Sequence, residues 1–265
     1  MAAPAPAALP RDPGALPLVD THCHVDLYPD PAAIVRQADA WRIYTVAVTN
    51  TPSVFDRLRE IVGESRYVRV ALGLHPELAT ERAGELPLFE ARLAATRYVG
   101  EVGLDYVTTV ESERATQRRV LSAVVGWCDA SGDKIVTVHS RRAADDVVDA
   151  FGASFRGTYI LHWYSGSTKA LRRALANGAY VSVNPAMIRA ERSMTLLAEV
   201  PRDRVLTETD GPFVQADGGP AEPRHVEHAI AGLALLWGTS AAETRHVVHS
   251  NFAAVLRGDA GTSSR

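Results

Sequence analysis

The chain is poor in cysteine and lysine and contains no long apolar run. Only Cys23 and Cys128 are present in 265 residues, which argues against a disulfide framework and predicts two free thiols. No apolar run approaches the roughly 20 residues that cross a bilayer, so we expect no contact with a membrane. Residues 1–16, MAAPAPAALPRDPGAL, lack the basic leader and continuous apolar segment of a signal peptide, and they predict a disordered Ala/Pro-rich extension. These absences predict a cytoplasmic protein.

An excess of positive charge is absent as well. The net charge is -3, with 28 Lys and Arg against 31 Asp and Glu. This balance argues against a protein that coats duplex nucleic acid through a broad basic surface, although it is compatible with a nuclease that holds a strand locally. Lys134 and Lys169 are the only lysines, so arginine supplies nearly all of the positive charge.

Apolar runs and helical segments alternate along the rest of the chain. Eight runs predict strands, at residues 17–21, 43–49, 67–72, 97–100, 135–138, 158–161, 179–183 and 204–207. Eight further segments predict helices, at 31–40, 53–62, 86–95, 111–131, 143–151, 167–177, 190–199 and 224–237. A last helix is expected at 240–256, with Ser240 as its N-cap and Glu243 three residues later. Eight βα units in a chain of this length predict an α/β fold, a single (β/α)8 TIM barrel over residues 17–258, followed by a flexible tail at 259–265.

Six chemically active side chains each close one of the apolar runs. They are His22, His24, Glu101, His139, His162 and Asp210. The C-terminal ends of parallel barrel strands meet at one face, and residues two apart on a strand project to the same side, so we expect these side chains to converge on a metal site. One such residue near a strand end is usually a hydrogen-bonded polar group, but six in this arrangement are not a coincidence. Six ligands exceed the needs of one catalytic ion, which predicts two divalent ions bridged by a carboxylate, an arrangement suited to phosphodiester hydrolysis.

Several longer motifs carry a family resemblance. They are VDTHCHVD at 19–26, ALGLHP at 71–76, YVGEVGLDY at 98–106, VTVHSRRA at 136–143, LHWYSGS at 161–167, LTETDGPF at 206–213 and NFAAVL at 251–256. In this order the motifs resemble those of the TatD family of metal-dependent deoxyribonucleases, within the amidohydrolase superfamily, over almost the whole chain. HWYSGS, where many members have HCFSG, and NPAMIR at 184–189 look more like the TatD-type nuclease of the Qat anti-phage systems.

The resemblance implies roles for the six side chains. His22, His24 and Asp210 would hold one ion, His139 and His162 the other, and Glu101 would bridge them. Glu101 and Asp210 are then the catalytic carboxylates, with Asp210 orienting the attacking water or accepting its proton. The ligand set implies Mg²⁺ or Mn²⁺ and also permits Zn²⁺.

The scarcity of lysine sharpens the comparison within the superfamily. Many relatives that hydrolyse lactones, amides or phosphotriesters bridge their metals with a carbamylated lysine, usually on the fourth strand. This chain has Glu101 there. Lys134 opens the fifth predicted strand at the far end of the barrel and Lys169 lies on a predicted helix, so neither is expected to reach the metals. The glutamate bridge resembles the nuclease type.

Side chains around the metals suggest how a nucleic acid strand would be held. Arg141 follows His139 by two positions and suits a phosphate. Tyr106, Trp163 and Tyr164 lie on metal-bearing loops, where they would either stack on unpaired bases or pack under the loop. His75 would contact the scissile phosphate or fix its own loop. The segment VQADGGPAEPRH after Asp210 departs from the RGxxNEP type common in the family, which leaves the substrate preference open.

These observations predict a metal-dependent deoxyribonuclease, a single-strand-preferring exonuclease that works in DNA repair or, with protein partners, in a Qat defence system. Two alternatives stay open. The same metals would serve a small-molecule hydrolase acting on a lactone, amide or acyl-tRNA bond, or the chain would be a non-catalytic subunit that binds nucleic acid or partner proteins. The sequence leaves open the choice of DNA, RNA or a modified nucleotide, the polarity of cleavage, the native metal and the oligomeric state.

Overall fold

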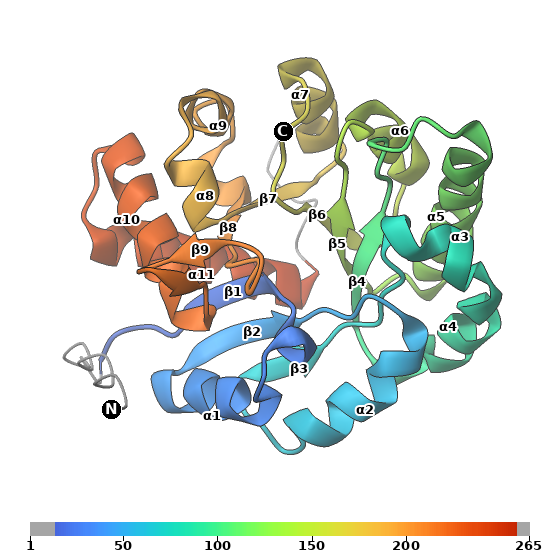
Figure 1. Cartoon of the computed structure of the whole chain (residues 1–265). Helices are drawn as coiled ribbons and strands as arrows, with labels where there is room; N and C mark the ends of the chain where they lie inside the picture. Colours follow the sequence, from blue (N-terminus) through green and yellow to red (C-terminus); the bar gives the residue numbers. More distant parts are fainter. Residues whose placement is uncertain (1–13, 259–265) are drawn as a thin grey trace.

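The computed structural model describes residues 14–258, and within them eight parallel strands form a ring with helices around its outside (Figure 1). The strands are β1 (Leu18–Cys23), β2 (Ile43–Ala47), β3 (Val68–Val70), β4 (Tyr98–Gly103), β5 (Ile135–His139), β6 (Thr158–Leu161), β7 (Tyr180–Val183) and β8 (Val205–Thr207). All eight predicted strands are therefore confirmed to within a few residues. Residues 1–13 of the predicted extension and the predicted tail at 259–265 lie outside the described residues.

The ring consists of two hydrogen-bonded sheets joined at two seams. β1, β2 and β3 form one sheet, and β4 to β8 form the other in chain order. At the first seam Leu72, just beyond β3, bridges to Val99 of β4. At the second seam the Asp210 amide donates to the His22 carbonyl at 2.9 Å, and the Thr21 hydroxyl donates to the Thr207 carbonyl at 3.1 Å. The fold is a (β/α)8 barrel, as predicted.

Eleven helices are present in the described residues. They are α1 (Pro31–Trp41), α2 (Pro52–Val62), α3 (Ala79–Arg82), α4 (Leu86–Arg92), α5 (Glu111–Ser131), α6 (Ala144–Phe151), α7 (Thr168–Ala176), α8 (Pro185–Ile188), α9 (Glu191–Leu197), α10 (Val226–Trp237) and α11 (Ala241–Arg257). Short 3-10 turns lie at η1 (Val25–Leu27), η2 (Pro76–Leu78), η3 (Ala83–Glu85), η4 (Leu93–Ala95), η5 (Arg202–Arg204) and η6 (Pro223–His225). Among the described residues, no helix has the length and apolar content needed to cross a membrane.

Local sequence signals set several helix ends. The Ser240 hydroxyl accepts from the Glu243 amide at 3.2 Å and the Glu243 carboxylate accepts from the Ser240 amide at 2.8 Å, which confirms the predicted capping box of α11. Ser167 caps α7 in the same way, by accepting from the Ala170 amide at 3.1 Å. The Ser167 cap ends the loop that follows β6 and carries His162, whereas Ser240 lies between α10 and α11. Both cysteines are buried and free, as predicted.

A small hairpin, absent from the sequence predictions, follows β8. β9 (Gln215–Ala216) and β10 (Gly219–Pro220) pair antiparallel. Asp217 and Gly218 form the turn with φ values of 50° and 83°, the left-handed pair that a tight hairpin requires. The carboxylate of Asp217 lies 3.5 Å from His225 Nε2, which ties the hairpin to the start of α10. The segment that departs from the family pattern is thus an ordered hairpin.

Candidate metal centre

The six predicted ligands meet in one buried cluster at the C-terminal ends of the strands. They lie in or shortly after β1 (His22, His24), β4 (Glu101), β5 (His139), β6 (His162) and β8 (Asp210). A pocket of about 450 Å³ opens over the cluster and is lined by all of them except His22, which lies fully buried below. The barrel therefore brings together residues as far apart in the chain as His22 and Asp210, as expected for the ends of parallel barrel strands.

Four ligand atoms lie around the two imidazoles of the first strand end. They are His22 Nε2, His24 Nε2, Glu101 Oε2 and Asp210 Oδ1. The distances from the two imidazole nitrogens to each other and to the carboxylate oxygens run from 3.3 to 3.7 Å. The atoms of His22, His24 and Glu101 form a triangle with edges of 3.3 to 3.4 Å, and an ion close to its centre would lie about 2 Å from each, the usual bond length from a metal ion to nitrogen or oxygen ligands. These three atoms fit one divalent cation, and Asp210 Oδ1 lies beside both imidazoles.

The other oxygen of Glu101 faces a second group of histidines. Glu101 Oε1 lies 2.7 Å from His139 Nδ1, 3.3 Å from His75 Nε2 and 3.8 Å from His162 Nε2. His75 was predicted to contact a phosphate or fix its loop, and the structure places it beside the predicted ligands. Its Nδ1 also accepts from the Glu77 amide at 3.2 Å, so the residue holds its loop as well. The two oxygens of one carboxylate thus face two separate sets of imidazoles.

Three of the histidines are oriented through their second ring nitrogen. His22 Nδ1 lies 2.7 Å from the Thr137 hydroxyl, and His139 Nε2 lies 2.8 Å from Asp105 Oδ2. His162 Nδ1 lies 3.0 Å from Glu208 Oε1. Partners of this kind fix the tautomer and ring orientation of metal-binding histidines. In each case the nitrogen left over is the one that faces Glu101.

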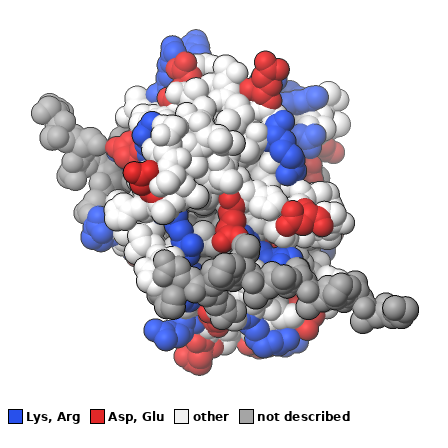
Figure 2. Space-filling view, turned by 90° about the vertical axis from the view of Figure 1, so that its left-hand side faces the viewer, with Lys and Arg blue, Asp and Glu red and all other residues white. Residues whose placement is uncertain are grey.

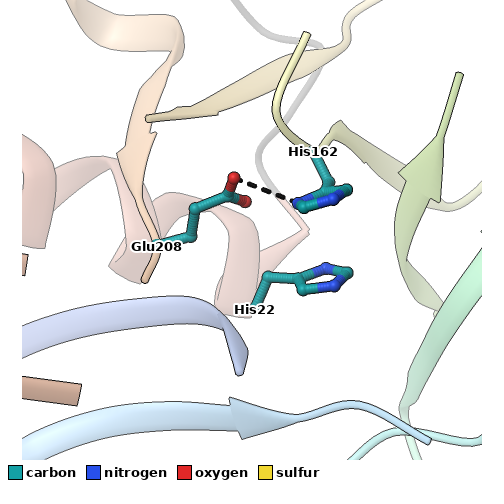
Figure 3. A group of neighbouring side chains, drawn as sticks. All are labelled: His22, His162 and Glu208. Carbon is teal, nitrogen blue, oxygen red and sulfur yellow. Dashed lines mark hydrogen bonds and ion pairs between the residues drawn. The ribbon is translucent and has the colours of Figure 1, made fainter. Parts of the chain in front are cut away.

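Figure 3 shows one of these partners, Glu208, hydrogen-bonded to His162, with the His22 ring stacked on His162. The two imidazoles stack with centroids 3.8 Å apart, and Glu208 points at the edge of the His162 ring. The same Oε1 atom also accepts from the Trp163 amide at 3.0 Å and from Asn184 Nδ2 at 3.1 Å. Glu208 is fully occupied by donors, so it positions His162 rather than acting as a ligand itself.

In the metal-free protein, burial and the charges of neighbouring side chains shift the pKa values of the clustered residues. Burial raises the pKa of Glu101, but the charges of His75 and His22 outweigh it and hold that pKa well below its usual value. Burial and the charge of His162 lower the pKa of His22 to about 3. Burial also lowers the pKa of His139, but hydrogen bonds with Asp105 and Glu101 outweigh this and raise it to about 10.

Two other histidines behave like His139. For His24, hydrogen bonds with Asp210 and Glu101 outweigh burial and raise the pKa to about 9. For His162, the charges of Glu208 and Asp210 outweigh burial and raise the pKa to about 9. Protons on these rings balance the buried carboxylates in the metal-free protein. Cations would replace those protons.

The sequence reasoning missed the residues that hold the ligands in place. Glu208, Asp105 and Thr137 were not singled out, and neither was Asp20, which accepts from the Thr209 amide at 2.9 Å and from the Thr209 hydroxyl at 2.6 Å. Burial raises the pKa of Asp20 to about 8. A usable signal existed for two of them, because Asp105 and Glu208 are carboxylates just beyond strand ends that already carry a predicted ligand.

Of the residues predicted to contact the substrate, some line the pocket and others do not. Arg141 and Trp163 line the metal pocket. Tyr106 does not line it, because its hydroxyl donates to Asp146 at 2.6 Å and its ring lies under the Arg114 guanidinium, 4.8 Å from the centroid. Lys134 lies before β5 and donates to the backbone carbonyl of Thr96 at 2.9 Å, so it faces away from the metal end of the barrel.

Comparison with known proteins places the chain in a family. A family model described as TatD related DNase matches residues 19–257. The chain belongs to the TatD family. It is 30% identical over 267 residues to the uncharacterized metal-dependent hydrolase YcfH of Escherichia coli, an alignment that covers 92% of this chain and 97% of YcfH.

Two further similarities extend the family relationship. The putative deoxyribonuclease tatdn3 of Danio rerio is 24% identical, over 88% of this chain and 94% of that protein. The crystal structure of the TatD homolog YjjV from Escherichia coli superposes with a TM-score of 0.80 at 24% identity and covers 90% of this chain and 97% of YjjV, which shows the shared fold. This TatD protein is a metal-dependent hydrolase with clustered candidate metal ligands.

Proposed function

We propose that this TatD protein is a divalent-metal-dependent deoxyribonuclease that hydrolyses phosphodiester bonds with two metal ions. The observation that carries the proposal is Glu101, whose two carboxylate oxygens face two different sets of imidazole nitrogens. Such a carboxylate would be shared by two divalent ions, and paired ions stabilise both the attacking and the leaving oxygen of an in-line displacement at phosphorus. The deoxyribonuclease name of the relative tatdn3 supports the choice of DNA.

The ligands divide between two sites. His22, His24 and Asp210 would hold one ion together with Glu101. His139 and His162 would hold the other, and His75 lies close enough to join them. The carboxylates of the site suit Mg²⁺ or Mn²⁺, and the added imidazole would favour Zn²⁺.

The reaction then follows from the groups around the pocket. Bound divalent ions lower the pKa of water towards ~7 and neutralise charge that develops on the phosphate. Asp210, at the pocket floor, orients the attacking water and accepts its proton. Arg141 lines the same pocket and contacts a phosphate oxygen through its guanidinium. Trp163 faces the neighbouring nucleotide.

A strand with a free single-stranded end fits this site best, because the ligands lie at the floor of a pocket rather than on a convex surface. We therefore propose exonucleolytic cleavage of single-stranded DNA. The similarity of residues 161–167 and 184–189 to nucleases of Qat anti-phage systems stays a prediction about the biological setting. An ATPase and a QueC-like enzyme encoded beside this chain would support it.

The test uses purified protein stripped of metal, reloaded with Mn²⁺ and given end-labelled single-stranded DNA. Wild type is compared with Glu101→Gln, which keeps the size of the side chain but loses the bridging charge. Glu90→Gln, an exposed change on α4, is the matched control. We expect loss of cleavage only in Glu101→Gln. Equal cleavage by wild type and Glu101→Gln, or hydrolysis of p-nitrophenyl acyl esters much faster than of DNA, would contradict the proposal.

A further inference from the structure

Large apolar side chains that remain exposed gather at the metal end of the barrel. Within the described residues these are Leu27, Val107, Val110, Trp163, Phe213 and Leu235. All but Leu235 follow the C-terminal ends of β1, β4, β6 and β8, whereas Leu235 lies on α10. Apolar groups concentrated around one opening mark a surface that contacts a ligand.

Two of these side chains are aromatic and line the metal pocket itself. Trp163 is 38% exposed and Phe213 is 58% exposed. The Phe213 ring contacts the His24 ring edge to face, with centroids 5.0 Å apart. The Trp163 ring meets the His162 ring in the same manner at 6.3 Å. Each aromatic ring therefore stands beside a histidine of a different ligand set, on either side of Glu101.

The backbone holds both rings where they are. Trp163 has a φ of 37°, a left-handed conformation that is costly for a bulky side chain, and its amide donates to Glu208 at 3.0 Å. The Phe213 amide donates to the Asp210 carbonyl at 2.9 Å. The groups that fix the ligands thus also fix the exposed rings. The next residue, Tyr164, is buried and donates its hydroxyl to the Ser167 carbonyl, so the strained conformation selects which ring reaches the pocket.

We propose that Trp163 and Phe213 are two base-stacking positions, one on each side of the scissile phosphate, so that the substrate is an unpaired strand whose flanking bases lie against these rings. This inference rests on the proposed nuclease function and names the two side chains that would select an unpaired strand. A phosphate at the pocket floor sends its two flanking nucleotides outward in opposite directions. Paired bases within a duplex keep their faces covered by their neighbours, whereas unpaired bases can present them to the rings.

The pocket has little positive charge, which favours base stacking over phosphate contacts as the main source of affinity for a nucleic acid strand. Arg141 is the only Lys or Arg among the described residues that line the pocket. On the face drawn in Figure 2, basic and acidic side chains are interspersed. With about one cation engaged, raising salt from about 50 to about 200 mM should weaken binding of a single strand only about threefold.

The experiment compares two labelled strands with the Mn²⁺-loaded protein. One is an ordinary oligonucleotide, and the other lacks the two bases that flank the cleaved bond. The variants are Trp163→Ala and Phe213→Ala, with Trp163→Phe as the conservative change and Leu235→Ala as the control. We expect each alanine to raise KM for the ordinary strand by about 5- to 150-fold, the range given by stacking free energies per base, with kcat nearly unchanged. Trp163→Phe should recover most of the affinity, and Leu235→Ala should have no effect.

The strand without bases separates the outcomes. Neither alanine variant should change its KM, and the preference of wild type for unpaired over blunt duplex DNA should shrink in the double variant. An equal loss on both strands would mean that the rings support the metal site, and no loss on either would mean that another partner covers them. Both results overturn the proposal while leaving the nuclease assignment intact. Undiminished cleavage by Glu101→Gln would instead overturn the function on which it rests.

Discussion

Glu208→Gln is expected to weaken the binding of one metal ion, while the fold and the binding of the other ion stay unchanged. Glu208 Oε1 accepts from His162 Nδ1 at 3.0 Å, from the Trp163 amide at 3.0 Å and from Asn184 Nδ2 at 3.1 Å, and its Oε2 accepts from Ser182. Glutamine retains a carbonyl oxygen for the first three donors, and its amide group meets a hydroxyl that can also accept. The donors of His162, Trp163 and Asn184 keep an acceptor and the Ser182 hydroxyl turns from donor to acceptor, so the change mainly removes charge.

The magnitude follows from the hydrogen bond to His162. A hydrogen bond to a charged group contributes about 1.5–3 kcal/mol and a neutral one about 0.5–1.5 kcal/mol. The difference of about 1 to 1.5 kcal/mol at this ring corresponds to about 5- to 12-fold weaker metal binding, near the lower end of the losses of about 10- to 100-fold found for such partners. Glu208→Ala would instead leave four buried donors without an acceptor at about 1–3 kcal/mol each, comparable to the stability of a whole domain.

Calorimetric titration of the metal-stripped protein with Mn²⁺ measures the effect. One of two binding steps should weaken by the stated factor, and the melting temperature of the metal-free protein should stay the same. Asp105→Asn removes charge beside His139 and should weaken the same step. Thr137→Val acts on His22 and should weaken the other step. If all three variants weaken both steps equally, or Glu208→Gln weakens neither, the division of ligands around Glu101 is wrong.

The remaining predictions concern pH, a helix cap and a close backbone approach. Because the pKa values of His24, His139 and His162 are raised to about 9, about 10 and about 9, the metal-free rings carry protons at neutral pH that metal binding must displace. The apparent Mn²⁺ affinity should therefore rise with pH up to about 9 to 10, and affinities that stay flat from pH 6 to 9 in calorimetry would contradict this. Ser240→Ala removes the cap of α11 and should cost about 1 kcal/mol, seen as a melting temperature about 2–4 °C lower, with metal binding unchanged. Gly73→Ala would place a Cβ 1.8 Å from a backbone oxygen and 2.5 Å from the Glu101 amide, so it should abolish metal binding in any folded fraction, and a metal content equal to wild type would show that this contact is relieved.

The order of the strands and the positions of the side chains at their ends could be predicted, because both follow from short patterns in the sequence. Continuous apolar runs mark parallel strands that are buried on both faces, and the end of each run marks the face where the loops meet. That logic requires no knowledge of which strand neighbours which. It placed Glu101, His139 and His162 at the same end of the barrel before any contact between them was known.

The elements that escaped prediction are short or depend on neighbours in space. α3 and α8 have four residues each, too few for a helical period to register. Thr137 lies 115 positions from His22, and nothing in the chain near either residue announces their contact. The hairpin of β9 and β10 is different, because Asp217-Gly218 is a strong turn signal that could have been used. His75 was noticed as a loop residue, but its place beside Glu101 follows from how β3 meets β4.

Glu208 links the two parts of the site that the sequence left apart. Its Oε1 atom receives both the His162 ring and the Trp163 amide, so one buried carboxylate sets a candidate metal ligand and the exposed indole at once. Loss of this acceptor would release the left-handed backbone at residue 163, because the Trp163 amide donates to Glu208. Removing Glu208 should therefore impair both catalysis and base stacking. Changing Trp163 alone should impair base stacking and leave catalysis intact. A cleavage assay on strands with and without flanking bases distinguishes these two variants. Glu208→Gln should lower the affinity for the metal ion, and so raise the Mn²⁺ concentration needed for cleavage, equally for both strands. Trp163→Ala should affect cleavage only of the strand that has bases.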